Sequence, residues 1–128
     1  MIDHIGISVS DFAASKRFYS AALQPLGFSL VLEVPAAATG RADVAGFGEP
    51  PKPEFWISGG TPNKSPVHIA LRVSSRAVVD AFYRAALAAG GKDNGAPGIR
   101  AHYHPHYYGA FVLDLDGHNI EAVCHDPE

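Results

Sequence analysis

An internal repeat constrains the fold of this chain more than any other feature of the sequence. Residues 4–23 and the residues 64 positions later, 68–87, share ten identities. Ordinary composition would give roughly one or two identities over this length by chance. Each copy begins with a histidine, His4 in the first and His68 in the second. Folding two similar units together would therefore bring two potential metal ligands to equivalent positions.

Length and composition predict one domain, residues 1–128, built from two modules near 1–60 and 64–125. The chain has 128 residues and 47% hydrophobic content, which is enough for two modules to share one core. Its net charge of -3 and its lack of basic runs argue against nucleic acid or a membrane surface as a partner. It has no apolar run of roughly 18 residues that could span a membrane, and its single cysteine, Cys124, cannot form an internal disulfide. We therefore expect a cytoplasmic protein whose partner is a small molecule or another protein.

Each copy opens with a strand pattern in which polar and apolar residues alternate. The pattern covers residues 2–9 in the first copy and 66–73 in the second. Because successive side chains of a strand point to opposite faces, His4 and His68 lie on the face opposite the apolar residues. We expect helices to cover the apolar face of each strand.

A helix pattern follows each of these strands. Polar residues at 10–11 and 74–75 can cap helices that run to about Leu23 and Ala89. Short strand candidates separated by glycine and proline come next: 29–34, 42–47 and 54–58 in the first module, and 100–104, 110–113 and 119–124 in the second. The segments expected to be loops are 35–40 and 92–98. The turn between the last two strands holds His118, which we expect to be exposed to solvent.

Each module therefore has the order strand, helix, strand, strand, strand. We expect an α+β fold in which the two βαβββ modules form a curved mixed β-sheet, with a cleft on one face and the helices on the outer face. This plan and three short motifs closely resemble the vicinal oxygen chelate superfamily, which includes glyoxalase I, extradiol dioxygenases and bleomycin-resistance proteins. The motifs are Asp3-His4-Ile5-Gly6, Val67-His68-Ile69-Ala70-Leu71, and the segment 111–121 that runs Phe-Val-Leu-Asp-Leu-Asp-Gly-His-Asn-Ile-Glu.

The resemblance covers nearly the whole chain and implies two alternative functions. The first is a divalent-metal-dependent enzyme that acts on a small oxygenated metabolite, with lyase, isomerase or dioxygenase chemistry by bidentate oxygen chelation. The alternative is a metal-free small-molecule binding or antibiotic-resistance protein of the bleomycin-resistance kind. Family members commonly pair, and short chains gain buried area by pairing, so we also expect a homodimer.

The resemblance places metal ligands at His4, His68 and Glu121, and makes Glu121 a catalytic candidate. Strand parity agrees, because Glu121 alternates with Ile120 and Ala122 and so points to the histidine side. Two imidazoles and one carboxylate with open positions suit Fe, Zn, Ni, Co or Mn as the divalent metal. The three ligands can come from one chain or from two chains of a dimer.

The last strand of the first module carries Glu54 and Trp56 on its cleft side. In glyoxalase I enzymes this strand holds a second metal-binding glutamate, so the resemblance makes Glu54 a candidate fourth ligand or substrate contact. An alignment that pairs Phe55 with Ile120 puts Trp56 at that position instead, where it would form a flat apolar wall for a substrate.

The segment 102–109, His-Tyr-His-Pro-His-Tyr-Tyr-Gly, concentrates histidine and tyrosine. An alternating strand would put His102 and His104 on one face, able to bind metal, shuttle protons or contact a substrate. The alternative is a loop with solvated histidines and packed tyrosines. The resemblance favours a position beside the cleft, which makes His104 and Tyr107 the catalytic candidates and His102 a substrate contact. Arg72, if it faces the cleft, can bind a carboxylate or phosphate of the substrate.

Overall fold

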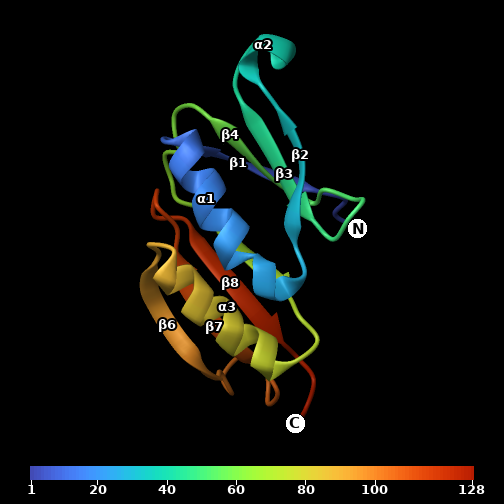
Figure 1. Cartoon of the computed structure of the whole chain (residues 1–128). Coiled ribbons are helices and arrows are strands. Elements are labelled where there is room, and N and C mark those ends of the chain that lie inside the picture. The colour runs from blue at the N-terminus through green and yellow to red at the C-terminus, as the bar shows by residue number, and fades with distance from the viewer.

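Each half of the chain folds as a strand, a helix and three further strands, and the computed structural model describes all residues from 1 to 128 (Figure 1). The first half contains β1 (Ile5–Val9), α1 (Phe12–Ala22), the 3-10 turn η1 (Gln24–Leu26), β2 (Ser29–Val34), the short helix α2 (Ala36–Thr39), β3 (Val44–Gly48) and β4 (Phe55–Gly59). The second half contains β5 (His68–Arg72), α3 (Arg76–Ala88), β6 (Lys92–Ile99), β7 (Tyr108–Leu113) and β8 (Asn119–Cys124). The predicted α+β fold is confirmed.

The strands form two separate four-stranded sheets of identical topology. Their orders are β1-β4-β3-β2 and β5-β8-β7-β6. In each sheet the first strand pairs with the last in parallel, and the other pairs are antiparallel. Figure 1 shows α1 and α3 lying side by side over the two sheets, with the other face of each sheet left uncovered. None of the helices has the length and the apolar composition that a membrane span requires.

The strand parity expected from the sequence is observed in both modules. In β5 the side chains alternate between exposed and half-buried, with His68 among the exposed ones. Under the helices, the ring of Tyr19 lies 4.8 Å from that of Phe55 and 4.9 Å from that of Phe18. Buried apolar side chains from both modules belong to one continuous cluster. The helix side is therefore largely filled by the core, and the opposite face, which carries His68, is open to solvent.

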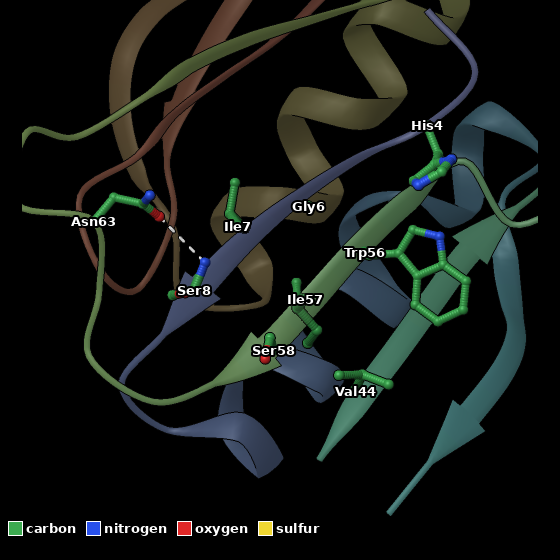
Figure 2. Close-up of a pocket in the computed structure, with 9 residues that line it drawn as sticks. All are labelled: His4, Gly6, Ile7, Ser8, Val44, Trp56, Ile57, Ser58 and Asn63. Carbon is green, nitrogen blue, oxygen red and sulfur yellow. Dashed lines mark hydrogen bonds between the residues drawn. The ribbon is translucent and has the colours of Figure 1, made fainter. Parts of the chain in front are cut away.

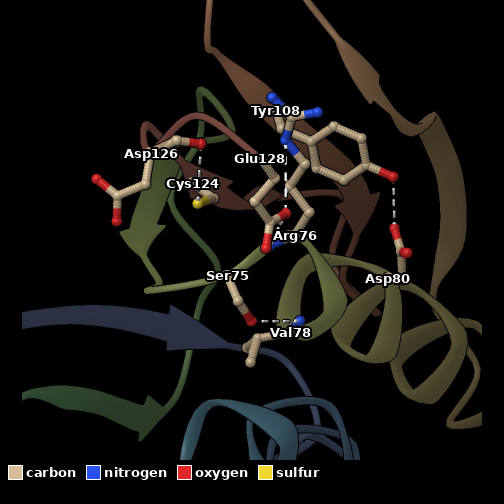
Figure 3. Close-up of polar contacts among 8 residues, drawn as sticks. All are labelled: Ser75, Arg76, Val78, Asp80, Tyr108, Cys124, Asp126 and Glu128. Carbon is tan, nitrogen blue, oxygen red and sulfur yellow. Dashed lines mark hydrogen bonds and ion pairs between the residues drawn. The ribbon is translucent and has the colours of Figure 1, made fainter.

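Side chains cap both long helices where the sequence predicts caps. Asp11 accepts a hydrogen bond of 3.0 Å from the backbone N–H of Ala14 at the start of α1. Ser75 accepts one of 3.3 Å from the N–H of Val78 at the start of α3 (Figure 3). Each cap satisfies a donor that the first helical turn leaves unpaired.

The chain end is attached to the start of α3 by a polar cluster (Figure 3). The guanidinium of Arg76 lies over the ring of Tyr108, 5.2 Å from its centroid, and Arg76 Nε is 3.6 Å from a carboxylate oxygen of Glu128. The hydroxyl of Tyr108 donates to Asp80 at 2.7 Å. These contacts link β7, α3 and the last residue on the outer side of the second module.

The prediction for residues 92–104 is wrong. Residues 92–98 belong to strand β6, and residues 100–104 form a turn rather than a strand. The segment lacks alternation because β6 is an edge strand, paired only with β7, and its register shifts at Gly95 and again before Gly98. Bulges at an edge accept the glycine and proline that normally argue against a strand.

The turn that follows β6 is closed by backbone hydrogen bonds. The N–H of Arg100 donates to the carbonyl of Tyr107 at 2.7 Å, and the N–H of His104 donates to the carbonyl of Arg100 at 3.3 Å. His102 and His104 therefore do not share the face of a strand. The other predicted loop, residues 35–40, contains the single-turn helix α2.

His118 is fully buried, which corrects the expectation that a turn residue would be exposed. The turn that carries it packs against the first module, whose position the local sequence does not predict. Its Nδ1 accepts a hydrogen bond of 3.1 Å from the N–H of Val67, so the ring proton lies on Nε2, which is 3.4 Å from the carbonyl of Ser8 in β1. His118 thus connects the two modules.

Candidate functional site

Glu121 is the central residue of the candidate site. It lies in β8, next to Ala70 of β5 and Phe111 of β7, on the face that the helices do not cover. Its side chain is nevertheless 0% exposed. One carboxylate oxygen is 2.8 Å from Nε2 of His68, and the other accepts a hydrogen bond from the hydroxyl of Tyr107. These two partners compensate the carboxylate for the water that it loses on burial.

A glycine makes room for this cluster. A Cβ atom at Gly109 would lie 3.2 Å from a carboxylate oxygen of Glu121 and 3.2 Å from the ring of Tyr107. Both distances are tighter than ordinary van der Waals contact. The contact between Glu121 and Tyr107 therefore depends on the absence of a side chain at residue 109.

A small pocket leads to Glu121 from the uncovered face. It has a volume of about 330 Å³ and is lined by His68, Tyr103, Tyr107, Phe111 and Glu121. The imidazole of His68 is 53% exposed, so this wall of the pocket is open to a ligand. A carboxylate, an imidazole and a phenol that converge on one aromatic pocket can bind a cation, exchange protons and orient an oxygen-bearing ligand.

Tyr107 is held as a neutral donor. Burial raises the pKa of its phenol well above the ordinary value, and the hydrogen bond to the Glu121 carboxylate raises it further. The positive charge of Arg100 acts on this pKa in the opposite direction. Tyr107 therefore keeps its proton at physiological pH and donates a hydrogen bond to the carboxylate of Glu121.

His4 lies apart from this cluster. Its imidazole is 59% exposed and is 2.6 Å from the carboxylate of Asp3, which also pairs with Lys52 at 3.1 Å. The hydrogen bond to His4, and after it the one to Lys52, lowers the pKa of Asp3. His4 and His68 both line a larger pocket of about 570 Å³, together with Glu54 and Arg72, but no three His, Cys, Asp or Glu side chains lie close enough to hold a metal ion.

Trp56 occupies the position in the first module that Glu121 occupies in the second. Trp56 pairs with Gly6 in the first sheet, whereas Glu121 pairs with Ala70 in the second, and residues 6 and 70 are equivalent in the repeat. Its indole lies across Gly46, where a Cβ atom would come within 2.9 Å of the ring. Trp56 and His4 line a pocket of about 390 Å³ in the first module (Figure 2).

Like His4, Trp56 and Arg72, three further candidate residues lie outside the Glu121 pocket. Glu54 is exposed and precedes β4. His102 packs on Tyr103 with ring centroids 4.1 Å apart. His104 lies 5.8 Å from the rings of both His106 and His125 and belongs to a surface cluster. Of the residues in segment 102–109 that the sequence singles out, the structure brings only Tyr107 to Glu121.

Three residues in or beside the pocket have no role in the sequence-based prediction: Tyr103, Phe111 and Arg100. Phe111 could have been found, because the short turn between β7 and β8 fixes a hairpin register that pairs it with Glu121. Arg100 could not, because the sequence pattern predicts a strand over residues 100–104 and this segment forms a turn. Its guanidinium lies over the ring of Phe111, with 5.4 Å between the guanidinium carbon and the ring centroid.

Comparisons with known proteins agree with this architecture. The model of the Glyoxalase/Bleomycin resistance protein/Dioxygenase superfamily matches residues 1–122. A glyoxalase/bleomycin resistance protein from Albidiferax ferrireducens T118 is 26% identical, with a TM-score of 0.76 over 95% of this chain and 97% of that chain. A mutant of the fosfomycin resistance protein FosX from Listeria monocytogenes, complexed with manganese(II) and 1S,2S-dihydroxypropylphosphonic acid, is 17% identical, with a TM-score of 0.69 over 96% and 90% of the two chains. A glyoxalase I mutant from Zea mays is 18% identical, with a TM-score of 0.72 over 95% of this chain and 43% of that chain. No curated protein matches the sequence.

Proposed function

This chain belongs to the Glyoxalase/Bleomycin resistance protein/Dioxygenase superfamily, and from that membership we propose that it is a divalent-metal-dependent enzyme acting on a small oxygenated metabolite. The observation that carries the proposal is the buried Glu121 carboxylate, held by His68 and Tyr107 at the end of an open pocket. Burying a carboxylate without a lysine or arginine partner costs folding free energy. A role in binding a metal or a substrate therefore explains the burial of Glu121 better than a contribution to the stability of the fold.

The side chains of the Glu121 pocket are suitable ligands for a divalent transition metal, but a single chain places only two of them next to each other. An imidazole nitrogen of His68 and a carboxylate oxygen of Glu121 lie 2.8 Å apart and suit Fe, Zn, Ni, Co or Mn. Within the chain no third ligand joins them. We assign that role to His4 of a second copy, because His4 is exposed and its only partner is the neighbouring Asp3. The complex of FosX with manganese(II) supports metal use on this fold.

Each residue of the pocket has a separate task in this proposal. A metal bound there would act as a Lewis acid toward two neighbouring oxygens of the substrate. Tyr107 keeps its proton and fixes one oxygen of Glu121, which leaves the other oxygen and the imidazole of His68 for binding. Tyr103 and Phe111 supply apolar walls that exclude water from the substrate. Whether the reaction is that of a lyase, an isomerase or a dioxygenase depends on the substrate.

Elemental analysis of the purified chain tests the proposal. We expect near-stoichiometric Fe, Zn, Ni, Co or Mn in the parent, and its loss in His68→Ala and in Glu121→Gln. His106→Ala removes an exposed histidine outside the pocket and should keep the metal. A parent that holds none of these ions even after each is added would contradict metal dependence.

Mixing variants tests the shared site. His4→Ala and Glu121→Gln should each fail to hold metal alone. Co-expression of the two would restore about one quarter of the parental metal, because half of the randomly paired dimers would be mixed and each would carry one intact site. A site contained within one chain would show no recovery.

A specific observation favours a second candidate, a metal-free protein that binds an aromatic or amphiphilic ligand. Trp56 stands where the equivalent residue of the other module is a carboxylate, so the first module offers a flat apolar surface. Trp56 and Tyr107 line different pockets of one chain, so a ligand held between them would need two chains or both pockets. Trp56 is the single tryptophan, so its fluorescence reports binding of planar aromatic compounds directly. Tight binding by chelator-treated protein would favour this function over the enzyme.

A further inference from the structure

Arg100 carries a positive charge that no acidic residue of the chain neutralises. Its guanidinium donates hydrogen bonds to two backbone carbonyls, that of Gly98 at 2.9 Å and that of Ala96 at 2.7 Å. The ion pairs of the chain involve Asp3, Glu33, Glu121 and Glu128, and none of them includes Arg100. The remaining N–H groups of this half-buried guanidinium are therefore free to bind an acceptor.

Two glycines of β6 form a cradle for this guanidinium. A Cβ atom at Gly95 would lie 3.2 Å from Nη2 of Arg100, and one at Gly98 would lie 3.1 Å from Nη1. Any other residue at these positions would push the guanidinium away from the strand. The ring of Phe111 supports it from below. The group is thus held in one place before a ligand arrives, which lowers the entropy cost of binding.

The same phenylalanine connects Arg100 to the candidate active site. Phe111 pairs with Glu121 across β7 and β8 and with Gly95 across β6 and β7, so the carboxylate and the cradle lie on opposite sides of its ring. Neighbouring strands are about 4.8 Å apart, which puts the guanidinium roughly 5 to 10 Å from Glu121. A small molecule that lies on Phe111 can reach both groups.

We propose that Arg100, which contacts the pocket residue Phe111 but does not itself line the Glu121 pocket, forms an anion-binding subsite beside that pocket, and that the substrate is a small organic acid whose carboxylate binds this guanidinium. A planar carboxylate matches two parallel N–H groups of an arginine. The carboxylate would lie on the Arg100 side of Phe111, away from the negative charge of Glu121. The inference rests on the proposed function for the identity of the pocket, but it does not require a metal.

Paired probes that differ only in charge test the subsite. Phenylacetate and phenylacetamide are titrated into the full chain after treatment with EDTA and removal of the EDTA by dialysis, and the shifts of backbone amide signals are followed by NMR. The parent should bind phenylacetate more tightly than phenylacetamide, and the largest shifts should fall on residues 95–100, 107 and 111. Arg100→Gln should lower affinity for phenylacetate by about tenfold or more and leave that for phenylacetamide unchanged, the loss expected for a charged hydrogen-bonded pair. Arg100→Lys should keep part of the preference, because it keeps the charge but loses the paired geometry.

A matched control separates the subsite from the overall charge. Arg84→Gln removes the same charge from the exposed side of α3 and should leave both affinities unchanged. The subsite is ruled out if the parent binds the two probes equally, or if Arg100→Gln weakens both to the same extent, as a purely structural role would do. Metal content is measured on the same preparations before the EDTA treatment, so that a chain purified without metal that still prefers the carboxylate contradicts the metalloenzyme and retains the anion subsite.

Discussion

The hydroxyl of Tyr19 on α1 donates a hydrogen bond of 2.5 Å to the carboxylate of Asp114, in the turn between β7 and β8. Both side chains are buried, and the other oxygen of Asp114 accepts the backbone N–H groups of Asp116 and His118 at 2.9 and 2.8 Å. Asp116 in turn accepts a hydrogen bond of 2.5 Å from the hydroxyl of Ser10. The turn of the second module is thus attached to the first module through polar groups at the edge of the shared core.

Tyr19→Phe should destabilise the chain by about 1–3 kcal/mol, because it leaves a buried carboxylate without one of its donors. The free energy of unfolding, measured by urea titration, checks this. Tyr83 is the equivalent residue of the second module and is only half-buried, so Tyr83→Phe is the matched control and should cost less. Equal losses of unfolding free energy in the two variants would show that the hydrogen bond between Tyr19 and Asp114 contributes no more to stability than the hydroxyl of Tyr83 does.

The stability of the chain should fall in alkaline solution, partly through Tyr19. Burial, followed by the charge of Asp114, raises the pKa of Tyr19 well above its ordinary value of 10.0. Above pH 10 the unfolded chain loses the phenolic proton while the folded chain keeps it. The contribution of Tyr19 to the free energy of unfolding is therefore complete below pH 10 and decreases as the pH rises further. Urea unfolding of the parent and of Tyr19→Phe between about pH 8 and 11 should show a shallower decrease in the variant. Parallel curves would contradict the assignment to Tyr19.

Gly46→Ala should displace the indole of Trp56. The added Cβ atom would lie 2.9 Å from the indole and 2.8 Å from the side chain of Pro53, so one of them must move. We expect a red shift of the fluorescence of this single tryptophan and a loss of roughly 1–3 kcal/mol of stability from overpacking. Gly6→Ala is the control, because its Cβ atom would meet Trp56 at an ordinary distance of 3.6 Å. An unchanged spectrum in Gly46→Ala would show that the indole does not rest on β3.

Tyr107→Phe should weaken metal binding without removing a ligand. Its hydroxyl fixes one oxygen of Glu121, and loss of such a supporting partner typically costs about 10–100-fold in metal affinity. Competition with a chelator, followed by elemental analysis, measures the effect. Tyr108→Phe removes the neighbouring hydroxyl, which bonds to Asp80 away from the pocket, and should leave affinity unchanged. Equal metal affinities of the parent and Tyr107→Phe would show that the Tyr107 hydroxyl does not support metal binding by Glu121.

The parts of the fold that were predicted correctly depend on local patterns. Helix caps act within one turn, so Asp11 and Ser75 could be recognised from their neighbours alone. Strand parity needs only the alternation of apolar residues, which is why the face of His68 could be assigned. The burial of Glu121 could not be predicted from local patterns alone. It depends on Phe111 in the neighbouring strand β7 and on Tyr107 in the turn before that strand.

The errors concern residues whose structure is decided by distant partners. Strand β6 has little intrinsic preference for a strand and forms because β7 offers an edge to pair with. His118 is buried because β1 of the other module passes over its turn. The position of Arg100 follows from both the strand and the turn after it. None of these contacts leaves a periodic signal in the sequence.

The exchange of Trp56 for Glu121 at equivalent positions makes the two modules chemically unequal. In a symmetric pair of chains that joined the first module of one copy to the second module of the other, every shared cavity would have an indole on one wall and a carboxylate on the opposite wall. A ligand in such a cavity would be bound in only one direction, with its apolar end on the indole. The two chains would be related by rotational symmetry, while each cavity would have two chemically different walls. A ligand with two identical ends could match only one of these walls and would therefore bind less favourably.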